Sequence, residues 1–160
     1  MKSLLVLLTT MLLMLPLCVE PVMADGKDEL SLSGAYTRPN DGDATWAFTG
    51  EYLIAAGPFV LGPSFGLFDS PGVDGSTFGG AIELNTTGLS GLFGGIALHK
   101  VGGDAGDAID YSGEARIGFK LGDGNGFFKG YLARTWTRDA DGAVTSPDST
   151  QAVMGLGLRF

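Results

Sequence analysis

The chain has 160 residues, of which 27 are glycine and one is cysteine, and its net charge is −8. This length fits a single domain, and the glycine content is more than twice the usual share of about 7%. An acidic chain without a cluster of lysine and arginine lacks the positive charge that phosphate contacts need, so the composition excludes a nucleic-acid partner.

Residues 1–24 have the features of a secretory signal peptide. Lys2 gives a positively charged start, and Leu4 to Leu17 form an apolar run. The run is shorter than the roughly 18–20 residues that a membrane-spanning helix needs. We therefore expect cleavage after Ala24, which leaves residues 25–160 as one mature domain.

Cys18 lies inside this expected signal peptide. A lipoprotein signal is the alternative interpretation, but Leu17 stands where such signals have a small residue before the modified cysteine. If cleavage follows Ala24, the mature chain has no cysteine, so no disulfide frames the fold.

The mature chain contains eight segments in which apolar residues alternate with small or polar ones. A period of two is typical of a strand with one face against an apolar medium. Segments rich in Gly, Pro, Asp and Asn separate these strands and predict turns and loops. The expected strands are Glu29 to Thr37, Ala44 to Ala55, Phe59 to Phe68, Thr77 to Thr86, Ser90 to Lys100, Ala108 to Leu121, Phe127 to Thr137 and Ser149 to Phe160.

The connections between these strands alternate in length. Those after the second, fourth and sixth strands are short, and the others are mostly longer, such as the loop expected over Asp69 to Ser76. Transmembrane barrels have short periplasmic turns and longer external loops. Ten residues at about 3.3 Å each, tilted by about 40°, rise roughly 25 Å, close to the height of the apolar band of such barrels. We therefore expect an all-β fold, an eight-stranded antiparallel up-and-down transmembrane β-barrel.

The polar face of the strands indicates which side meets lipid. It holds mainly Gly, Ala, Ser and Thr, whereas a face in water would be crowded with long polar side chains. Small residues with a few charges suit the narrow interior of an eight-stranded barrel, and isolated charges there would be costly. We expect the charges to pair as a plug, the alternative being side chains that merely keep the lumen hydrated. The expected lumen cluster is Glu51, Glu83, Glu114, Arg116, Lys120 and Arg159.

Aromatic residues gather at both ends of the apolar face. Such bands are typical of the headgroup regions of a bilayer, although aromatic residues are common in any strand. The girdle expected near the loops is Tyr36, Trp46, Tyr111 and Trp136. The girdle expected near the turns is Tyr52, Phe59, Phe119 and Phe128.

Two residues fit this pattern poorly. Pro63 lies inside the third strand and has no N–H to donate, so we expect a local bulge or a lost ladder bond. Arg134 shares a face with Leu132 and Trp136 and would point into lipid close to the external rim, where a long side chain can reach the headgroups. A bulge that turns Arg134 inward is the alternative.

The last strand ends on Phe160, with Leu158 and Leu156 at the preceding alternate positions. This end resembles the closing strand of bacterial outer-membrane barrels, which is also the signal that the barrel assembly machinery reads. Together with the signal peptide, the eight strands and the loop asymmetry, the chain resembles the small OmpX- and OmpA-type barrels.

The resemblance implies a porin-like monomer in the cell outer membrane of a Gram-negative bacterium. Its partners would be outer-membrane lipids, lipopolysaccharide and the assembly machinery, and its role structural or surface-interacting. The second interpretation is a barrel that binds a small, lipid-like molecule, either soluble in the periplasm or bound to the membrane. A narrow pore or an outer-membrane lipid-modifying enzyme ranks third.

Catalytic, cofactor and metal sites are not expected. His99 is the only histidine, and outer-membrane lipid A deacylases carry a serine two positions from the catalytic histidine on the same strand, a pattern that Lys100 and Val101 do not provide. The aspartates of the expected loops are ordinary turn formers without the spacing of a calcium repeat. We therefore expect the protein not to be an enzyme.

Overall fold

The structure, a computed structural model, describes residues 27–37, 45–70, 72–85, 91–122, 125–145 and 150–160. The expected signal peptide, residues 1–24, lies outside these ranges, as do four expected strand ends, Ala44, Thr86, Ser90 and Ser149. Among the helices of the described ranges, none is long and apolar enough to span a membrane.

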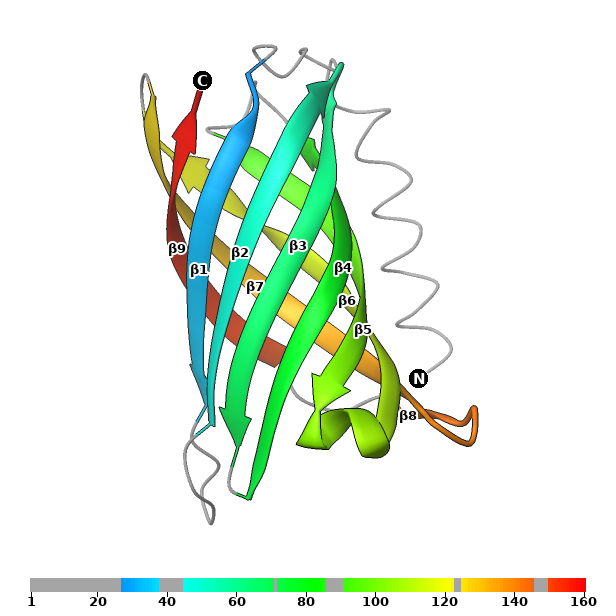
Figure 1. Cartoon of the computed structure of the whole chain (residues 1–160). Helices are drawn as coiled ribbons and strands as arrows, with labels where there is room; N and C mark the ends of the chain where they lie inside the picture. The colour runs from blue at the N-terminus through cyan, green and yellow to red at the C-terminus, as the bar shows by residue number, and fades with distance from the viewer. Residues whose placement is uncertain (1–26, 38–44, 71, 86–90, 123–124, 146–149) are drawn as a thin grey trace.

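The described residues form one antiparallel sheet that closes on itself as a barrel of eight long strands, tilted against the barrel axis (Figure 1). Each strand pairs with its neighbour in sequence, and β1 also pairs with β9, from Glu29 opposite Arg159 to Ala35 opposite Val153, which leaves the barrel wall without a free edge. The prediction of an all-β, eight-stranded up-and-down barrel is confirmed. The long strands are β1 (Glu29–Thr37), β2 (Thr45–Ala56), β3 (Phe59–Ser70), β4 (Val73–Asn85), β5 (Leu92–Gly103), β6 (Ile109–Leu121), β7 (Gly126–Asp139) and β9 (Thr150–Arg159).

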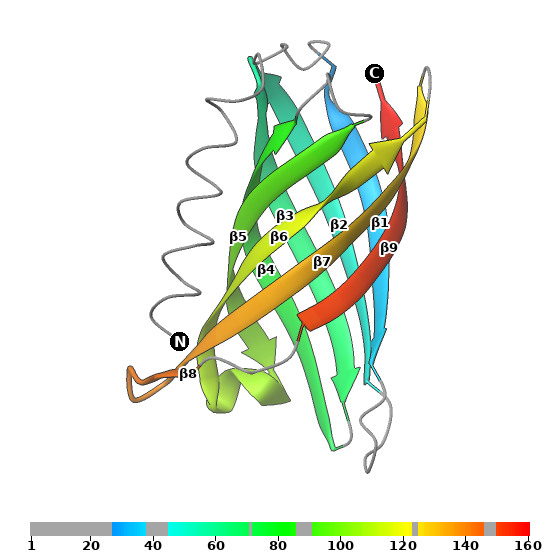
Figure 2. The ribbon, with the colours of Figure 1, turned by 180° about the vertical axis from the view of Figure 1, so that it is seen from behind.

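Two short elements mark one end of the barrel. The 3₁₀ helix η1 (Asp104–Asp107) joins β5 to β6, and the short strand β8 (Val144–Thr145) pairs with the end of β7 as a hairpin beyond the wall (Figure 2). We call this the loop end. The C-terminus and the β2–β3 turn lie at the opposite end, which we call the turn end.

The β3–β4 connection is much shorter than the loop expected over Asp69 to Ser76. β3 continues to Ser70 and β4 begins at Val73, and these two residues are partners in the ladder. Gly72 has a φ of 77°, a conformation that side chains disfavour and that a tight turn requires. The prediction of a long loop is wrong, because residues that usually form loops lie here within paired strands.

Pro63 interrupts the ladder toward β2 without shifting its register. Glu51 pairs with Ser64 and Ile54 with Leu61 in the same register, and the positions between them are unpaired. Pro63 still pairs with Gly80 on the β4 side. The ladder between β2 and β3 is therefore interrupted at Pro63, as one of the two expectations had it. The other expectation, a bulge, is wrong, because the register does not shift.

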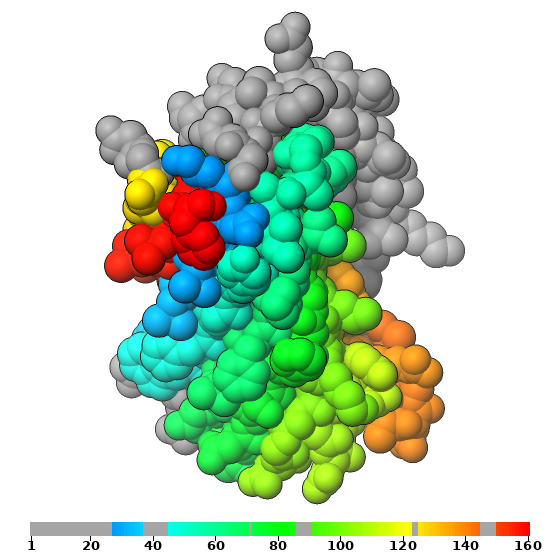
Figure 3. All heavy atoms as spheres, turned by 45° about the horizontal axis from the view of Figure 1, so that its top comes forward, coloured from blue at the N-terminus to red at the C-terminus, as the bar shows by residue number. Residues whose placement is uncertain are grey.

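The two faces of the wall differ sharply in composition. Among the described residues, 27 large hydrophobic side chains are exposed on the outside, and 11 hydrophobic residues, several of them alanine, are buried. Figure 3 shows side chains of consecutive strands standing uncovered on one side of the barrel. Ten polar or charged residues are buried, including Glu83 and Lys129. The barrel is thus apolar outside and charged inside.

Candidate functional site

The interior of the barrel holds a connected group of four carboxylates and four cations, which we call the lumen network. Every member occupies an inward position of its strand, because side chains alternate between the two faces of a sheet. Six of the eight strands contribute. The members are Glu29 on β1, Glu51 on β2, Glu83 on β4, Glu114, Arg116 and Lys120 on β6, Lys129 on β7 and Arg159 on β9.

The centre of the network is a square of two carboxylates and two cations. Arg116 Nη1 lies 2.5 Å from Glu51 Oε1 and 3.0 Å from Glu83 Oε1. Lys129 Nζ lies 2.8 Å from Glu51 Oε2 and 2.6 Å from Glu83 Oε1. All four side chains are at most 1% exposed. Charges buried this deeply are stable only when they are paired and hydrogen-bonded.

The network extends from this square in both directions along the lumen. Lys120 Nζ bridges Glu83 Oε2 at 2.8 Å and Glu29 Oε2 at 2.5 Å, and Arg159 Nε lies 3.2 Å from Glu29 Oε1. On the other side, Arg116 Nε lies 2.9 Å from Glu114 Oε1. Four negative and four positive groups give a balanced interior, which limits the cost of removing them from water.

Aromatic rings fill the space around the cations. Lys120 Nζ and Lys129 Nζ lie 5.0 and 5.1 Å from the centroid of the Phe93 ring, within the range of a cation–π interaction. Phe93 is 2% exposed and packs edge-on against Tyr131 at 6.0 Å. At the turn end, the Arg159 guanidinium carbon lies 4.7 Å from the Phe127 ring. The interior around the network is thus packed with side chains.

The structure brings together all six residues of the expected lumen cluster. Sequence reasoning missed two members, Glu29 and Lys129. Alternation gives the signal for their inward direction, because Glu29 precedes the outward Leu30 and Lys129 follows the outward Phe128. Alternation does not predict their partners, because the paired residues are far apart in sequence. Lys129 and Glu51, for example, are separated by 78 positions.

The aromatic girdle residues all lie on the outer face. At the loop end, Tyr36 and Trp46 are partners in the ladder, with ring centroids 4.4 Å apart. At the turn end, the Phe119 and Phe128 rings lie 6.1 Å apart. The remaining members, Tyr111, Trp136, Tyr52 and Phe59, also occupy outward positions of their strands.

The three residues of the expected assembly signal are exposed on the outer face of β9 and just beyond it. Leu156 is 68%, Leu158 55% and Phe160 62% exposed. β9 pairs with both β1 and β7, so the strand that carries this pattern is also the strand that closes the barrel.

Arg134 occupies an outward position on β7, opposite Ala115 on β6 and Thr150 on β9. The β6–β7 register runs without a shift through this position, so a bulge does not turn the side chain inward. The only irregularity in that pairing lies between Ile109 and Tyr111.

His99 has a serine partner that the sequence did not indicate. His99 Nε2 lies 3.0 Å from Ser64 Oγ, and the two residues come from β5 and β3. Ser64 is 1% and His99 6% exposed. A nucleophile needs access to its substrate, so this buried pair has the character of a structural hydrogen bond. Within the described part of the chain, no group of three or more His, Cys, Asp or Glu residues is arranged to hold a metal ion.

No protein-family model matches the chain, and no curated protein matches its sequence. A function can therefore be inferred only from the fold, the outer wall and the lumen network.

Proposed function

We propose that this chain is an integral outer-membrane β-barrel with a structural or surface-interaction role, in which side chains close the lumen. The observation that carries the proposal is the inverted distribution of side chains. Bulky apolar residues cover the outside of the barrel, and a square of charged side chains is buried at its centre.

A barrel in water would have the opposite arrangement. Monomeric soluble proteins rarely expose a contiguous apolar patch larger than a few hundred Å², because each Å² of apolar surface in water costs about 25 cal/mol. Here the apolar side chains surround the barrel on every long strand. Hydrocarbon tails remove that cost, and a closed barrel satisfies the backbone hydrogen bonds that a bilayer cannot.

The ends of the wall support the same proposal. Tyr36 and Trp46 are in contact at the loop end, and the rings of Phe119 and Phe128 lie together near the turn end. Bands of aromatic rings at two levels suit the two headgroup regions of a bilayer. With the C-terminal Phe160, this layout resembles the OmpX- and OmpA-type barrels.

The lumen network favours a plug rather than a wide pore. Eight strands enclose a space that their own side chains can fill. Arg116, Lys129, Glu51 and Glu83 cross that space from four different strands, and none of them is more than 1% exposed.

The test is membrane fractionation combined with a gel of unboiled and boiled samples. We expect the protein only in outer membranes, and we expect the unboiled form to migrate as a compact species. A variant that lacks residues 2–24 is the control, because without an export signal it should stay out of that fraction. A freely soluble periplasmic protein would contradict the proposal and support a soluble binding barrel.

A further inference from the structure

The cations on the outer face are confined to one sector of the barrel. β2, β3 and β4 contain no lysine or arginine. Of the cations in the described residues, those on the outer face are Lys100 on β5 and two arginines on β7, Arg134 and Arg138. On the next strands around the wall, β4 and β3, two carboxylates, Asp69 and Asp74, are instead partners in the ladder.

The two arginines have no carboxylate partner among the described residues, whereas Lys100 Nζ is paired with Asp110 Oδ1 at 2.8 Å. Arg134 and Arg138 flank Trp136 on the same face of β7. A guanidinium on a lipid-facing wall is unfavourable unless it reaches the headgroups or meets an anion. This position therefore favours a negatively charged partner supplied by the membrane.

A groove of about 390 Å³ on the outer wall is lined by Arg138, and Arg134 lies four residues earlier on the same face of β7. Gly113 forms its floor, because it stands between Leu98 and Trp136 in the sheet. A Cβ on Gly113 would lie 2.2 Å from the Trp136 ring, so glycine is what allows the indole to lie flat against the wall. The other residues that line the groove are Tyr111, Arg138 and Val144.

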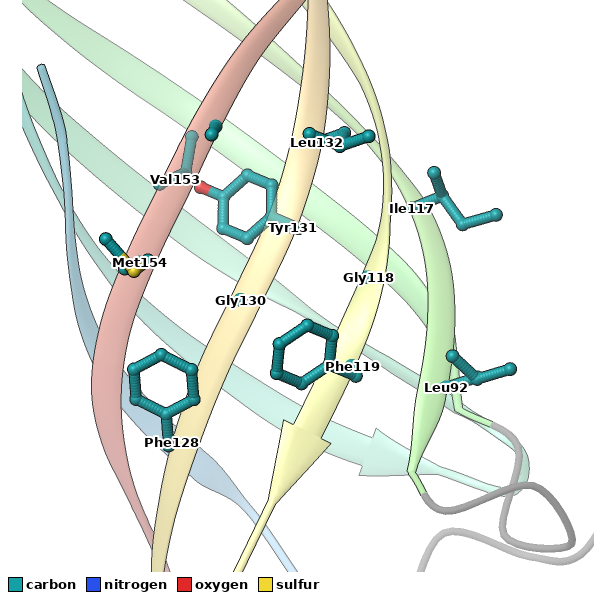
Figure 4. A pocket seen from close by; sticks show the side chains of 11 residues that line it. Leu92, Ile117, Gly118, Phe119, Phe128, Gly130, Tyr131, Leu132, Val153 and Met154 are labelled. Atoms are coloured by element: carbon teal, nitrogen blue, oxygen red, sulfur yellow. The ribbon is translucent and has the colours of Figure 1, made fainter.

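A second, separate groove of about 380 Å³ lies on the same two strands nearer the turn end. Its residues are apolar, and Figure 4 shows the rings of Phe119 and Phe128 beside Gly130. Between the two grooves, Ala115 lies opposite Arg134, and the next outward pair, Ile117 and Leu132, belongs to the second groove. A groove with cationic and aromatic residues thus lies on the same wall as an apolar groove, which we call the channel and whose lining includes Gly130 and Ala152.

We propose that this outer wall of β5, β6 and β7 binds an anionic lipid, with its phosphate group at Arg134 and Arg138 and an acyl chain in the channel. The proposal rests on the membrane location proposed above. Phosphate fits because guanidinium groups donate several hydrogen bonds to its oxygens. The two positive charges, which no carboxylate of the described residues neutralises, complement a negative headgroup. The channel fits an acyl chain because its lining is apolar.

The test is native mass spectrometry of the full mature chain in neutral detergent micelles, titrated with lipids. The probes are lipid A, phosphatidylglycerol and phosphatidylcholine. We expect lipid A or phosphatidylglycerol to bind at least about tenfold more tightly than zwitterionic phosphatidylcholine, since charge-assisted hydrogen bonds supply the difference. Preference for lipid A or for phosphatidylglycerol identifies the source of the phosphate. Equal binding of all three lipids would overturn the proposal.

Variants separate the two halves of the site. Arg134→Gln combined with Arg138→Gln should abolish the preference for the anionic lipid. Ala152→Leu should weaken lipid binding by narrowing the channel, which Ala152 lines, while the arginines stay. Lys27→Gln removes a charge outside this wall and should leave the preference intact. An unchanged preference in the double arginine variant would overturn the site. A barrel that fractionates with outer membranes yet shows no preference would refute only this inference, whereas a freely soluble chain would refute the proposed function itself.

Discussion

The backbone groups of Asp28 and Phe160 exchange two hydrogen bonds, of 3.1 and 3.2 Å, where the start of the described chain meets its end. Asp28 also fixes β2 through its side chain, since Tyr52 Oη donates to Oδ2 at 2.8 Å and the Ala55 amide to Oδ1 at 3.1 Å. One residue thus joins the first, second and last strands at the turn end.

Deletion of Phe160 should therefore weaken barrel closure. Two lost backbone hydrogen bonds correspond to about 1–3 kcal/mol of unfolding free energy, measured by urea unfolding of the protein refolded in detergent micelles. Phe160→Ala is the matched control, because it keeps the backbone bonds. If the ring serves as an assembly signal, Phe160→Ala should refold normally in detergent and yet yield less barrel in cells. Equal stability of the deletion and wild-type chains would contradict the closure role.

Glu83 is the residue on which the lumen network depends most. It meets Arg116, Lys120 and Lys129, and its side chain is fully buried. Glu83→Gln leaves three cations facing one fewer carboxylate, so we expect a loss of about 3–5 kcal/mol in unfolding free energy. The measurement is urea unfolding in micelles, followed by fluorescence.

The control for that variant is Asp110→Asn, which breaks the exposed pair with Lys100. Exposed ion pairs contribute little because water and salt screen them. We expect the unfolding free energy of this control to equal that of the wild-type protein. A Glu83→Gln variant as stable as the control would show that the network does not hold the barrel together.

The strands and the direction of their side chains were predictable, because alternation with period two follows from backbone geometry alone. β1 has the bounds that the sequence indicated, and the inward position of Glu51 or Arg116 followed from bulky neighbours on either side. The β3–β4 turn was not predictable, since Asp, Gly, Pro and Ser over Asp69 to Ser76 usually form loops.

The side-chain partners inside the barrel were not predictable from the sequence either. Ser64 and His99 come from strands that are not adjacent, with β4 between them. The same holds for Lys129 and Glu83, whose strands are separated by β5 and β6. Such contacts depend on how far strands tilt around the barrel, and no local sequence signal encodes that distance.

Two adjacent glycines on β4 offer a test of how closely the strands pack. A Cβ on Gly79 would lie 1.9 Å from the carbonyl oxygen of Leu98, a backbone atom that cannot rotate away. The nearest atom to a Cβ on Gly80 is at 3.4 Å, an ordinary contact. We expect Gly79→Ala to lower the unfolding free energy by about 1–3 kcal/mol and Gly80→Ala to be tolerated. Equal effects of the two changes in thermal unfolding would argue against the close β4–β5 approach.

The tryptophans report on the membrane proposal directly. The chain has two, Trp46 and Trp136, both on the outer face near the loop end. In vesicles of brominated lipids, we expect bromine near the headgroups to quench each tryptophan more than bromine at the chain ends, because interfacial rings lie at headgroup level. Trp46→Phe and Trp136→Phe isolate the two signals. Quenching by aqueous iodide in place of bromolipid would place the rings in water and count against the proposal.

Conductance tests the plug, because the lumen network crosses the interior of the barrel. In planar bilayers we expect the wild-type protein to show no steady, large conductance. Glu83→Ser combined with Lys129→Ser removes one charge of each sign from the central square, so the interior stays balanced while volume is vacated. This double variant should show more frequent openings than the wild-type chain. The control is Lys100→Gln, which lies on the outer face and should stay silent. A steady, large wild-type conductance would contradict the plug, because it would mean that the charged side chains line an open path for ions.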